Sequence, residues 1–364
     1  MTVTSPFRIG VTRDFLNAQG DLVFGDIGLT LLESQPGVTV EFLPDYGIEL
    51  PATVGRDFDA LLVLAPRVTA STLATCDRLA IIARFGVGYD NVDVDACTAS
   101  DVLLTITPDG VRRPVAVSAL AMLMALSHRL IDKDRLTRQG RWNEKLDYMG
   151  VGLTGRTLGL VGFGNIGQEI ARIAAPLQMR IVATDPFAPP EATNALGAEL
   201  LSLDRLLSEA DFVCVCCALT ADTRHLLDAR RLALLKPTAF LINVARGSVV
   251  DQAALAEILR QRRIAGAALD VFEKEPIDPS DPLLELDNVL LSPHAVCWTD
   301  ELFRGNGEAA CRSILDVRKG QVPNDVVDRH VIDHPGLKQK LARYAAGDSR
   351  PSPFLEMKLC DATS

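Results

Sequence analysis

Short apolar runs alternate with helical stretches over the first hundred residues of the chain. Helical stretches are predicted between the runs, for example around Ile27–Glu33 and Ala70–Ala74. Strand-length apolar runs separated by helices are typical of a parallel sheet, so the pattern predicts a parallel α/β domain of about 100 residues. The predicted strands are Phe7–Val11, Val38–Phe42, Ala60–Leu64, Ala80–Arg84 and Val102–Thr105.

A helix predicted from Val115 to about Arg129 interrupts this alternation, because it is apolar nearly all round. Such a helix is expected to be buried between domains or subunits. A polar segment, residues 132–155 with Trp142, follows it.

The alternation resumes at residue 157 and gives about six strands, enough for a full doubly wound sheet. Helices are predicted at Leu203–Glu209, Ala229–Leu235 and Gln252–Gln261. The predicted strands are Thr157–Val161, Arg180–Thr184, Phe212–Cys217, Ala239–Asn243, Gly266–Asp270 and Val289–Leu291.

A last helix, about Asp300–Arg318, is expected to return to the first domain, which otherwise lacks a closing element. The second domain is therefore predicted as an insertion, residues 108–296, into a domain of residues 1–107 and 297–335. The crossings near 107–115 and 295–300 are expected to act as hinges. Residues 336–364 are interpreted as a polar C-terminal tail rather than a third domain.

The inserted domain opens with a glycine fingerprint. Gly162, Gly164 and Gly167 have the spacing G-x-G-x-x-G between a strand and a helix, and Asp185 ends the next strand. In this context the glycines allow a tight turn, the approach of a pyrophosphate and close helix packing, while the helix N-terminus attracts the phosphates. Asp185 would accept hydrogen bonds from the adenosine ribose and repel a 2′-phosphate, so NAD is favoured over NADP. The alternative is a glycine turn in an ordinary βαβ unit.

Composition and charge narrow the class of protein. The 364 residues suffice for two domains, and 48% hydrophobic with 23% charged residues is ordinary globular composition. A net charge of −10 argues against nucleic acid or an anionic membrane as a partner.

The N-terminus lacks the pattern of a signal peptide, and no apolar run is expected to reach transmembrane length. The eight cysteines lie mostly in apolar runs and are interpreted as reduced core residues rather than metal ligands. We therefore expect a cytoplasmic protein without a metal site.

The loop Phe85-Gly86-Val87-Gly88 follows a predicted strand directly. Its two glycines could expose consecutive backbone N–H groups as a nest for an anion. A plain turn from strand to helix fits the same residues equally well.

Three polar residues follow successive predicted strands: Arg246, Glu275 and His294. Loops at the carboxyl ends of parallel strands converge on the ligand crevice, so the three can meet beside a nicotinamide. Arginine presents a fork of donors that matches a carboxylate and its neighbouring carbonyl. Histidine can move a proton to or from a substrate oxygen, and a nearby carboxylate favours its imidazolium form. Taken singly, each could be an ordinary surface or loop residue.

Several motifs together resemble the D-isomer-specific 2-hydroxyacid dehydrogenases, most nearly the D-3-phosphoglycerate dehydrogenase branch. They are GFGNIG, CALTADTRHLLD, NVARGSVVD, ALDVFEKEP and NVLLSPHA, within a resemblance that covers roughly residues 55–318. The resemblance implies two Rossmann-like domains, a homodimer, and hydride transfer between NAD and C2 of a 2-hydroxy or 2-keto acid.

The resemblance also implies site residues by motif position. Arg246 would hold the carboxylate and carbonyl of the substrate, His294 would be the acid/base, and Glu275 its partner. Asp270 would bind the nicotinamide carboxamide, and the backbone of Phe85, Gly86, Val87 and Gly88 the substrate carboxylate. The implied cofactor-binding residues are Gly162, Gly164, Asn165, Ile166, Gly167, Asp185, Cys217, Ala218, Thr223, Ala245, Asp270 and His294.

The chain departs from the family pattern in places that bear on substrate choice. Ala218 stands where a proline is frequent, Cys216 where a histidine is common, and Val117 where the family usually has glutamate. Trp298 lies shortly after the predicted acid/base, His294, and is expected to line one side of the substrate pocket. The pair Arg112-Arg113 suggests a substrate with a second negative group, although a solvent-exposed hinge explains it equally well.

Two other functions stay open at this point. Family resemblance extends to corepressors that keep the same three residues, so an NADH-sensing scaffold is one. A dehydrogenase of formate or phosphite is the other, and the formate enzymes are disfavoured because they place glutamine where Glu275 stands.

Overall fold

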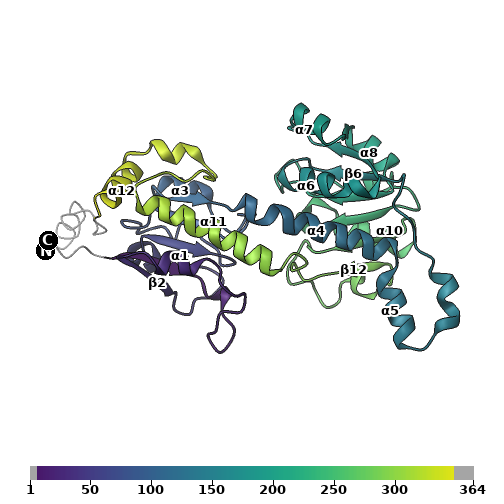
Figure 1. The fold of residues 1–364 in the computed structure, drawn as a ribbon, viewed down its shortest axis with the longest axis horizontal. Helices are drawn as coiled ribbons and strands as arrows, with labels where there is room; N and C mark the ends of the chain where they lie inside the picture. The colour runs from purple at the N-terminus through teal and green to yellow at the C-terminus, as the bar shows by residue number, and fades with distance from the viewer. Residues whose placement is uncertain (1–5, 348–364) are drawn as a thin grey trace. The chain divides into compact units, whose positions relative to one another are not determined.

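The computed structural model describes residues 6–347. The chain divides into two compact units: unit 1 comprises Met1–Val111 and Thr299–Ser364, and unit 2 comprises Arg112–Trp298. The first boundary falls inside helix α4 (Pro108–Ser127) and the second just before helix α11 (Asp300–Arg318). Both units are parallel α/β structures (Figure 1).

Unit 1 is built on a five-stranded parallel sheet of order β2-β1-β3-β4-β5. This order reverses between β1 and β3, as in flavodoxin-like doubly wound folds. The first two predicted strands are confirmed in full, and the other three each lose one terminal residue. The strands are β1 Phe7–Val11, β2 Val38–Phe42, β3 Ala60–Val63, β4 Ile81–Arg84 and β5 Leu103–Thr105.

Helices cover the sheet of unit 1. α2 (Thr53–Asp57) and α3 (Val94–Ala99) contribute Val54 and Cys97 to a core with strand residues such as Leu61, Ile82 and Leu104. α1 (Leu29–Glu33) packs against α11, which itself lies on β3 and β4. The predicted return of α11 to the first domain is therefore confirmed.

The segment Ala70–Ala74, for which the sequence pattern predicts a helix, is instead a series of turns. Hydroxyl groups explain the difference, because they offer the backbone alternative partners. Thr72 Oγ1 accepts from Thr69 N and donates to the carbonyl of Leu50, which ties the segment to its neighbours.

The described part of the C-terminal segment, up to residue 347, belongs to unit 1. η6 (Arg329–Asp333) leads into α12 (Pro335–Ala345), a helix within the segment that the sequence pattern predicts as a polar tail. Lys340 Nζ donates to the carbonyls of Leu79, Ser100 and Asp101. The rest of the predicted tail, residues 348–364, lies outside the described residues.

Unit 2 is built on a seven-stranded parallel sheet of order β12-β11-β10-β9-β6-β7-β8. The reversal between β6 and β9 is that of a dinucleotide-binding Rossmann sheet. The prediction of about six strands missed β8, whose two residues form no apolar run. The strands are β6 Thr157–Val161, β7 Arg180–Thr184, β8 Glu199–Leu200, β9 Phe212–Val215, β10 Phe240–Asn243, β11 Gly266–Leu269 and β12 Val289–Leu291.

Apolar cores lie on both faces of this sheet. One face packs against α8 (Leu203–Glu209), α9 (Ala229–Leu232) and α10 (Gln252–Arg260). The other packs against α4 and α6 (Asn165–Ala174). Because every central strand is covered on both sides, these strands have continuous apolar sequences rather than alternating ones.

The remaining helices are α5 Leu130–Arg138 and α7 Pro190–Ala195, with short 3-10 turns η1 Arg13–Phe15, η2 Trp142–Tyr148, η3 Ala175–Leu177, η4 Gly247–Val249 and η5 Pro282–Glu285.

Helix α4 begins seven residues earlier than predicted, since Pro114 is accommodated in its interior. It is also long and apolar enough to cross a membrane by length and composition alone, so the expectation that no segment reaches this length was wrong. However, 61% of its most apolar window is buried, as in a core helix. Val117 and Met124 on the same helix remain 46% and 36% exposed, so its burial within the chain is incomplete.

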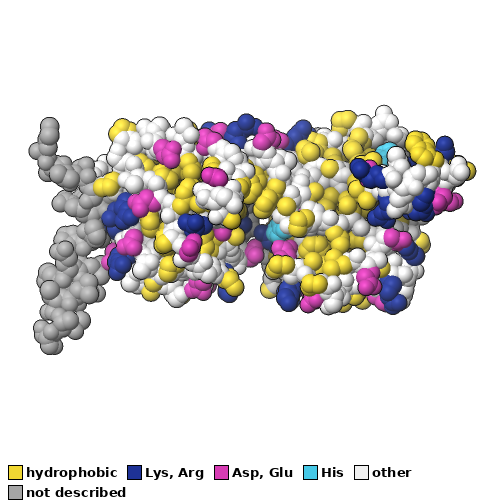
Figure 2. Space-filling view, turned by 90° about the horizontal axis from the view of Figure 1, so that it is seen from below, with side chains coloured by type: hydrophobic (Ala, Val, Ile, Leu, Met, Phe, Trp, Pro, Cys, Tyr) yellow, Lys and Arg dark blue, Asp and Glu magenta, His cyan; other side chains and the backbone are white. Residues whose placement is uncertain are grey.

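Charged side chains of both signs are interspersed on the face shown in Figure 2, with hydrophobic patches between them.

Candidate active site

The glycine fingerprint forms the turn between β6 and α6. Gly162 has φ +103, and a Cβ there would lie 2.7 Å from the backbone nitrogen of Cys217. A Cβ on Gly167 would overlap the carbonyl of Gly162, whereas one on Gly164 would meet nothing within 4 Å. The first and third glycines therefore permit close packing, and the second leaves open space beside the loop. Gly164 also begins α6 without a side-chain cap, so the helix N-terminus can receive phosphates.

Asp185 lies at the end of β7 and holds the glycine loop. Its Oδ2 accepts a hydrogen bond from Phe163 N at 2.7 Å, and its Oδ1 accepts one from Phe187 N at 2.8 Å. Each carboxylate oxygen can accept a second hydrogen bond, so ribose hydroxyls can still bind. The sequence did not indicate this additional structural contact.

The cysteines after β9 are uncharged packing residues beside the glycine turn. Cys216 Sγ donates to the carbonyl of Gly162 at 3.2 Å, and burial raises the pKa of Cys217 to about 11. Thr223 Oγ1 donates to the carbonyl of Ala218 at 2.7 Å and closes the following turn. All described cysteines are free, and no described group of three or more His, Cys, Asp or Glu residues could hold a metal ion.

Arg246 is positioned by a buried asparagine that the sequence analysis missed. Asn243 Oδ1 accepts from Ala245 N at 3.0 Å, and Asn243 Nδ2 donates to the carbonyl of Arg246 at 3.1 Å. Gly247 then packs so closely on Phe272 that a Cβ would overlap its backbone. The Arg246 loop and the loop that leads to Glu275 are thus held together.

His294 and Glu275 form a direct pair. The distance from His294 Nδ1 to Glu275 Oε2 is 2.7 Å, and Glu275 Oε1 accepts from Phe272 N at 3.0 Å. Burial tends to raise the pKa of Glu275, but hydrogen bonds from His294 and Phe272 outweigh it and lower the pKa below its usual value. Glu275 is therefore a carboxylate at neutral pH. No described residue hydrogen-bonds to His294 Nε2, which is available for a substrate.

Asp270 supports the turn that carries His294. It is 4% exposed, and its Oδ1 accepts from Ala295 N at 2.9 Å and Val296 N at 3.0 Å. Burial raises the pKa of Asp270 despite these hydrogen bonds. His294 itself has φ +55, a left-handed conformation that costs a non-glycine residue about 1–3 kcal/mol. The two N–H groups held by Asp270 help to maintain that conformation.

The strand order explains why the three residues meet. Strands β10, β11 and β12 are neighbours, and Arg246, Glu275 and His294 follow them in that order. The positive charge of Arg246 also contributes to lowering the pKa of Glu275. Trp298, the last residue of unit 2, is 50% exposed.

The loop Phe85–Gly88 of unit 1 presents two consecutive backbone N–H groups. Gly86 has φ +126; its N–H donates to Thr107 Oγ1 at 2.8 Å and its carbonyl accepts from Thr107 N at 3.0 Å. The next two N–H groups, of Val87 and Gly88, make no hydrogen bond to any residue that the structure describes. Two adjacent donors therefore remain for a ligand.

Of the basic pair Arg112-Arg113, the second residue is held by an ion pair. Arg113 Nη1 lies 2.8 Å from Glu169 Oε1, and Arg172 contacts the same carboxylate. Arg113 is thus occupied by a partner in unit 2.

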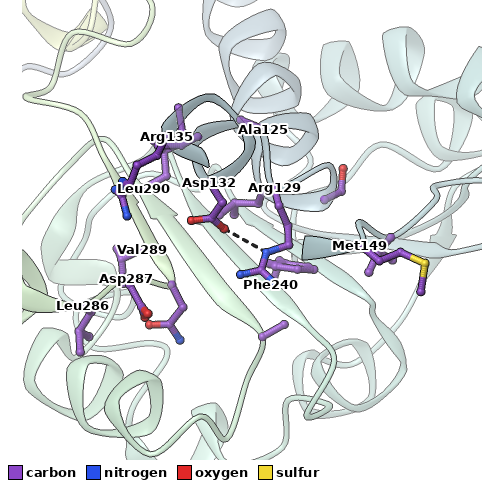
Figure 3. A pocket seen from close by; sticks show the side chains of 16 residues that line it. Ala125, Arg129, Asp132, Arg135, Met149, Phe240, Leu286, Asp287, Val289 and Leu290 are labelled. Carbon is purple, nitrogen blue, oxygen red and sulfur yellow. Dashed lines mark hydrogen bonds and ion pairs between the residues drawn. The ribbon is translucent and has the colours of Figure 1, made fainter. Parts of the chain in front are cut away.

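A separate pocket of about 280 Å³ lies in unit 2 beside α5, as Figure 3 shows. In its lining, Phe240 and Val289 begin β10 and β12, and Ala265 directly precedes β11. It is therefore at the amino edge of the sheet, opposite the edge that carries His294. Ligands of open parallel sheets bind at the carboxyl edge, so this pocket is not the nucleotide site.

Comparison with known proteins agrees with this geometry. Residues 120–295 match the model of the D-isomer specific 2-hydroxyacid dehydrogenase NAD-binding domain. A glyoxylate reductase of Thermococcus onnurineus is 42% identical over 292 residues, which cover 78% of this chain and 87% of that protein. The chain belongs to the D-isomer specific 2-hydroxyacid dehydrogenase family. The predicted family is confirmed, but the phosphoglycerate dehydrogenase branch is not specified by these matches.

Solved structures support the same assignment. A protein of Thermus thermophilus is 33% identical with a TM-score of 0.76, over 88% of this chain and all of that one. A glyoxylate reductase of Paecilomyes thermophila is 27% identical with a TM-score of 0.76, over 89% of this chain and 99% of that one. The protein is accordingly an NAD-dependent oxidoreductase that acts on a CH–OH group, with the predicted two-domain Rossmann-like fold.

Proposed function

We propose that the protein interconverts small 2-keto acids and D-2-hydroxy acids, with glyoxylate as one substrate. The observation that carries the proposal is the pair His294–Glu275 at 2.7 Å, beside Arg246 at the carboxyl edge of an NAD-binding sheet. The glyoxylate reductases that match most of this chain support the choice of substrate.

In this proposal the three polar residues divide the work. Arg246 holds the substrate carboxylate and polarises the neighbouring carbonyl through its fork of donors. His294 donates the proton at Nε2 to the carbonyl oxygen in reduction and accepts it in oxidation. Glu275 stays ionised, fixes the ring through Nδ1 and stabilises the imidazolium form.

NADH, when bound, supplies the hydride that reaches C2 of the keto acid. Its proposed binding residues are the glycine loop Gly162–Gly167 and Asp185, whose open side and uncapped helix suit a dinucleotide. Cys217, Ala218, Thr223 and Ala245 are proposed to line its edge. Asp270 remains proposed as the partner of the nicotinamide carboxamide, with its Oδ1 already accepting two N–H groups.

On the substrate side, we propose that Val87 N and Gly88 N bind the carboxylate and that Trp298 limits the side chain of the acid. Hydrolysis or metal chemistry forms no part of this scheme, since a carbonyl reduction needs only the hydride, one proton and charge stabilisation.

A homodimer is proposed from the apolar surface of unit 2. Leu146 and Met149 are each 83% exposed, and Trp142 is 63% exposed, all within or next to η2. Leu130 and Ile131 at the start of α5 add to the same apolar set. Exposed apolar residues gathered on adjacent elements mark an interaction surface.

We also propose a cytoplasmic location without nucleic acid or membrane as partner. Neither a corepressor-like scaffold nor a phosphite dehydrogenase has a specific observation in its favour.

The test is NADH consumption by the purified protein against a panel of 2-keto acids from glyoxylate and hydroxypyruvate to phosphohydroxypyruvate and bulky acids. We expect turnover with glyoxylate, and its loss in Arg246→Ala and His294→Ala with NADH binding retained. Activity that survives both substitutions would refute the site, and NADH binding without turnover on any acid would favour the scaffold.

A further inference from the structure

The pocket beside α5 in unit 2 takes no part in the proposed reaction. Its volume is about 280 Å³, and it lies at the amino edge of the sheet (Figure 3). An engineered cavity of about 150 Å³ holds benzene, so this pocket has room for a ligand of roughly 6–12 non-hydrogen atoms. Most of its wall is apolar and comes from Leu126, Val151, Phe240, Leu286 and Leu290.

The charged residues in the wall leave one cation without a partner. Both acids are paired: Asp132 Oδ2 lies 3.0 Å from Arg129 Nε. Asp287 pairs with Arg262. Arg135 also lines the pocket, and its guanidinium forms no hydrogen bond or ion pair with any residue that the structure describes. Because a guanidinium presents a planar fork of donors that matches a carboxylate, the pocket favours an acid as its ligand.

A polar atom in the same wall also lacks its partner. Asn288 Nδ2 donates to the carbonyl of Leu259 at 3.2 Å, which fixes the orientation of the amide. Asn288 Oδ1 is buried and accepts no hydrogen bond from any described residue. A buried acceptor without a donor costs free energy, and native structures rarely leave one unless a water or ligand completes it. The ligand that suits the pocket therefore carries an O–H or N–H group as well as a carboxylate.

We propose that this pocket binds a small carboxylic acid with an apolar body and an O–H or N–H group, as in an apolar 2-hydroxy acid or amino acid. The carboxylate pairs with Arg135, the apolar body lies against Phe240 and Leu290, and the donor reaches Asn288 Oδ1. The site is independent of the proposed reaction, whose residues lie at the opposite edge of the same sheet.

The experiment is calorimetric titration of the full chain with four probes that share one carbon skeleton. 2-Hydroxy-4-methylpentanoate and leucine carry the acid and a donor, 4-methylpentanoate lacks the donor, and 2-hydroxy-4-methylpentanamide lacks the charge. We expect the first two to bind at one site per chain, and the tighter of them identifies the donor that the pocket prefers. Loss of the donor or of the charge should raise the dissociation constant about tenfold or more.

Three variants test the position of the site. Arg135→Met should weaken both acids about tenfold or more and leave keto-acid reduction unchanged. Arg138→Met removes an exposed arginine of α5 that does not line the pocket, and it should bind like wild type. Ala265→Leu narrows the pocket without changing its charge and should weaken all four probes. Thermal unfolding and NADH affinity verify the fold of each variant.

The same titrations in Arg246→Ala separate this pocket from the active site. Binding that survives in Arg246→Ala and is weakened in Arg135→Met supports the inference. Binding that is lost in Arg246→Ala and unchanged in Arg135→Met would place the acid in the active site and overturn it. Absence of binding to any form would overturn it too, as when a second copy of the chain fills the pocket. None of these results depends on turnover, so a failure of the proposed reaction would leave the inference standing.

Discussion

Replacing Glu275 by glutamine tests the charge of the proposed acid/base pair while preserving its shape. The carboxylate lies 2.7 Å from His294 Nδ1 and accepts a second hydrogen bond from Phe272 N, both of which an amide oxygen can imitate in part. A hydrogen bond to a charged group contributes about 1.5–3 kcal/mol. The two side chains are 36% and 43% exposed, so water screens the pair and the lower part of that range applies. A loss of about 1.5–2 kcal/mol corresponds to a 10- to 30-fold decrease in kcat/KM for keto-acid reduction.

The pH profile gives an independent readout of the same substitution. Reduction requires a proton on the histidine, and an ionised Glu275 is the partner of its other ring nitrogen. We therefore expect the dependence of kcat/KM on pH to differ between wild type and Glu275→Gln, which lacks this charge. Glu273→Gln, an equal charge change on the same loop, is the control and should keep the wild-type profile.

The assay is NADH consumption with glyoxylate between pH 5 and 10, together with NADH affinity to verify the fold. An unchanged rate and an unchanged pH profile in Glu275→Gln would refute the argument that the reaction depends on the charge of the carboxylate. Equal losses in the Glu273 control would assign the effect to the loop rather than to the pair.

Four other expectations follow from the described contacts. Asp185→Ala should raise the ratio of NADP to NAD use by about tenfold, or ~1.4 kcal/mol, as measured by kcat/KM for each cofactor; an unchanged ratio means that the carboxylate does not reach the ribose. Gly247→Ala should lower kcat about 100-fold with NADH binding kept, because the new Cβ displaces Phe272 and with it the catalytic loop; near-wild-type kcat would contradict the close packing. Asp59→Ala should lower the free energy of unfolding of unit 1 by roughly 3–5 kcal/mol in denaturant, because the fully buried carboxylate accepts hydrogen bonds from Arg8 N, Arg78 and Tyr344 Oη. A decrease of less than about 1 kcal/mol would show that these groups find other partners. Burial lowers the pKa of Lys340 from 10.5 to about 8, so between these pH values the unfolded chain binds more protons than the folded one. The free energy of unfolding should therefore rise with pH across that window. Lys340→Met should abolish the rise, and an equal rise in the variant would assign it to another group.

The sequence predicted local structure well where one physical signal dominated. Apolar runs located nearly all strands, because strands covered on both faces are apolar throughout. The spacing of Gly162, Gly164 and Gly167 before a helix predicted a dinucleotide turn, since few other structures require glycine at all three positions. The same signals failed for β8, which is too short to form an apolar run, and for Ala70–Ala74, where hydroxyl hydrogen bonds replace a helix.

The candidate site combined what sequence could and could not specify. The residue types at the ends of successive strands predicted that Arg246, Glu275 and His294 would meet, because parallel strands present their carboxyl ends at one edge. Nothing local predicted that Asn243 would brace the arginine loop, that Asp270 would hold the turn of His294, or that Asp185 would bind Phe163 N.

These supporting contacts were decided only by tertiary structure. Each joins a side chain to backbone groups whose position depends on how neighbouring strands and loops pack, not on the residues beside it in the chain. The sequence thus determined which chemical groups the protein has and near which strand ends they lie, while the fold determined their orientation, ionisation and partners.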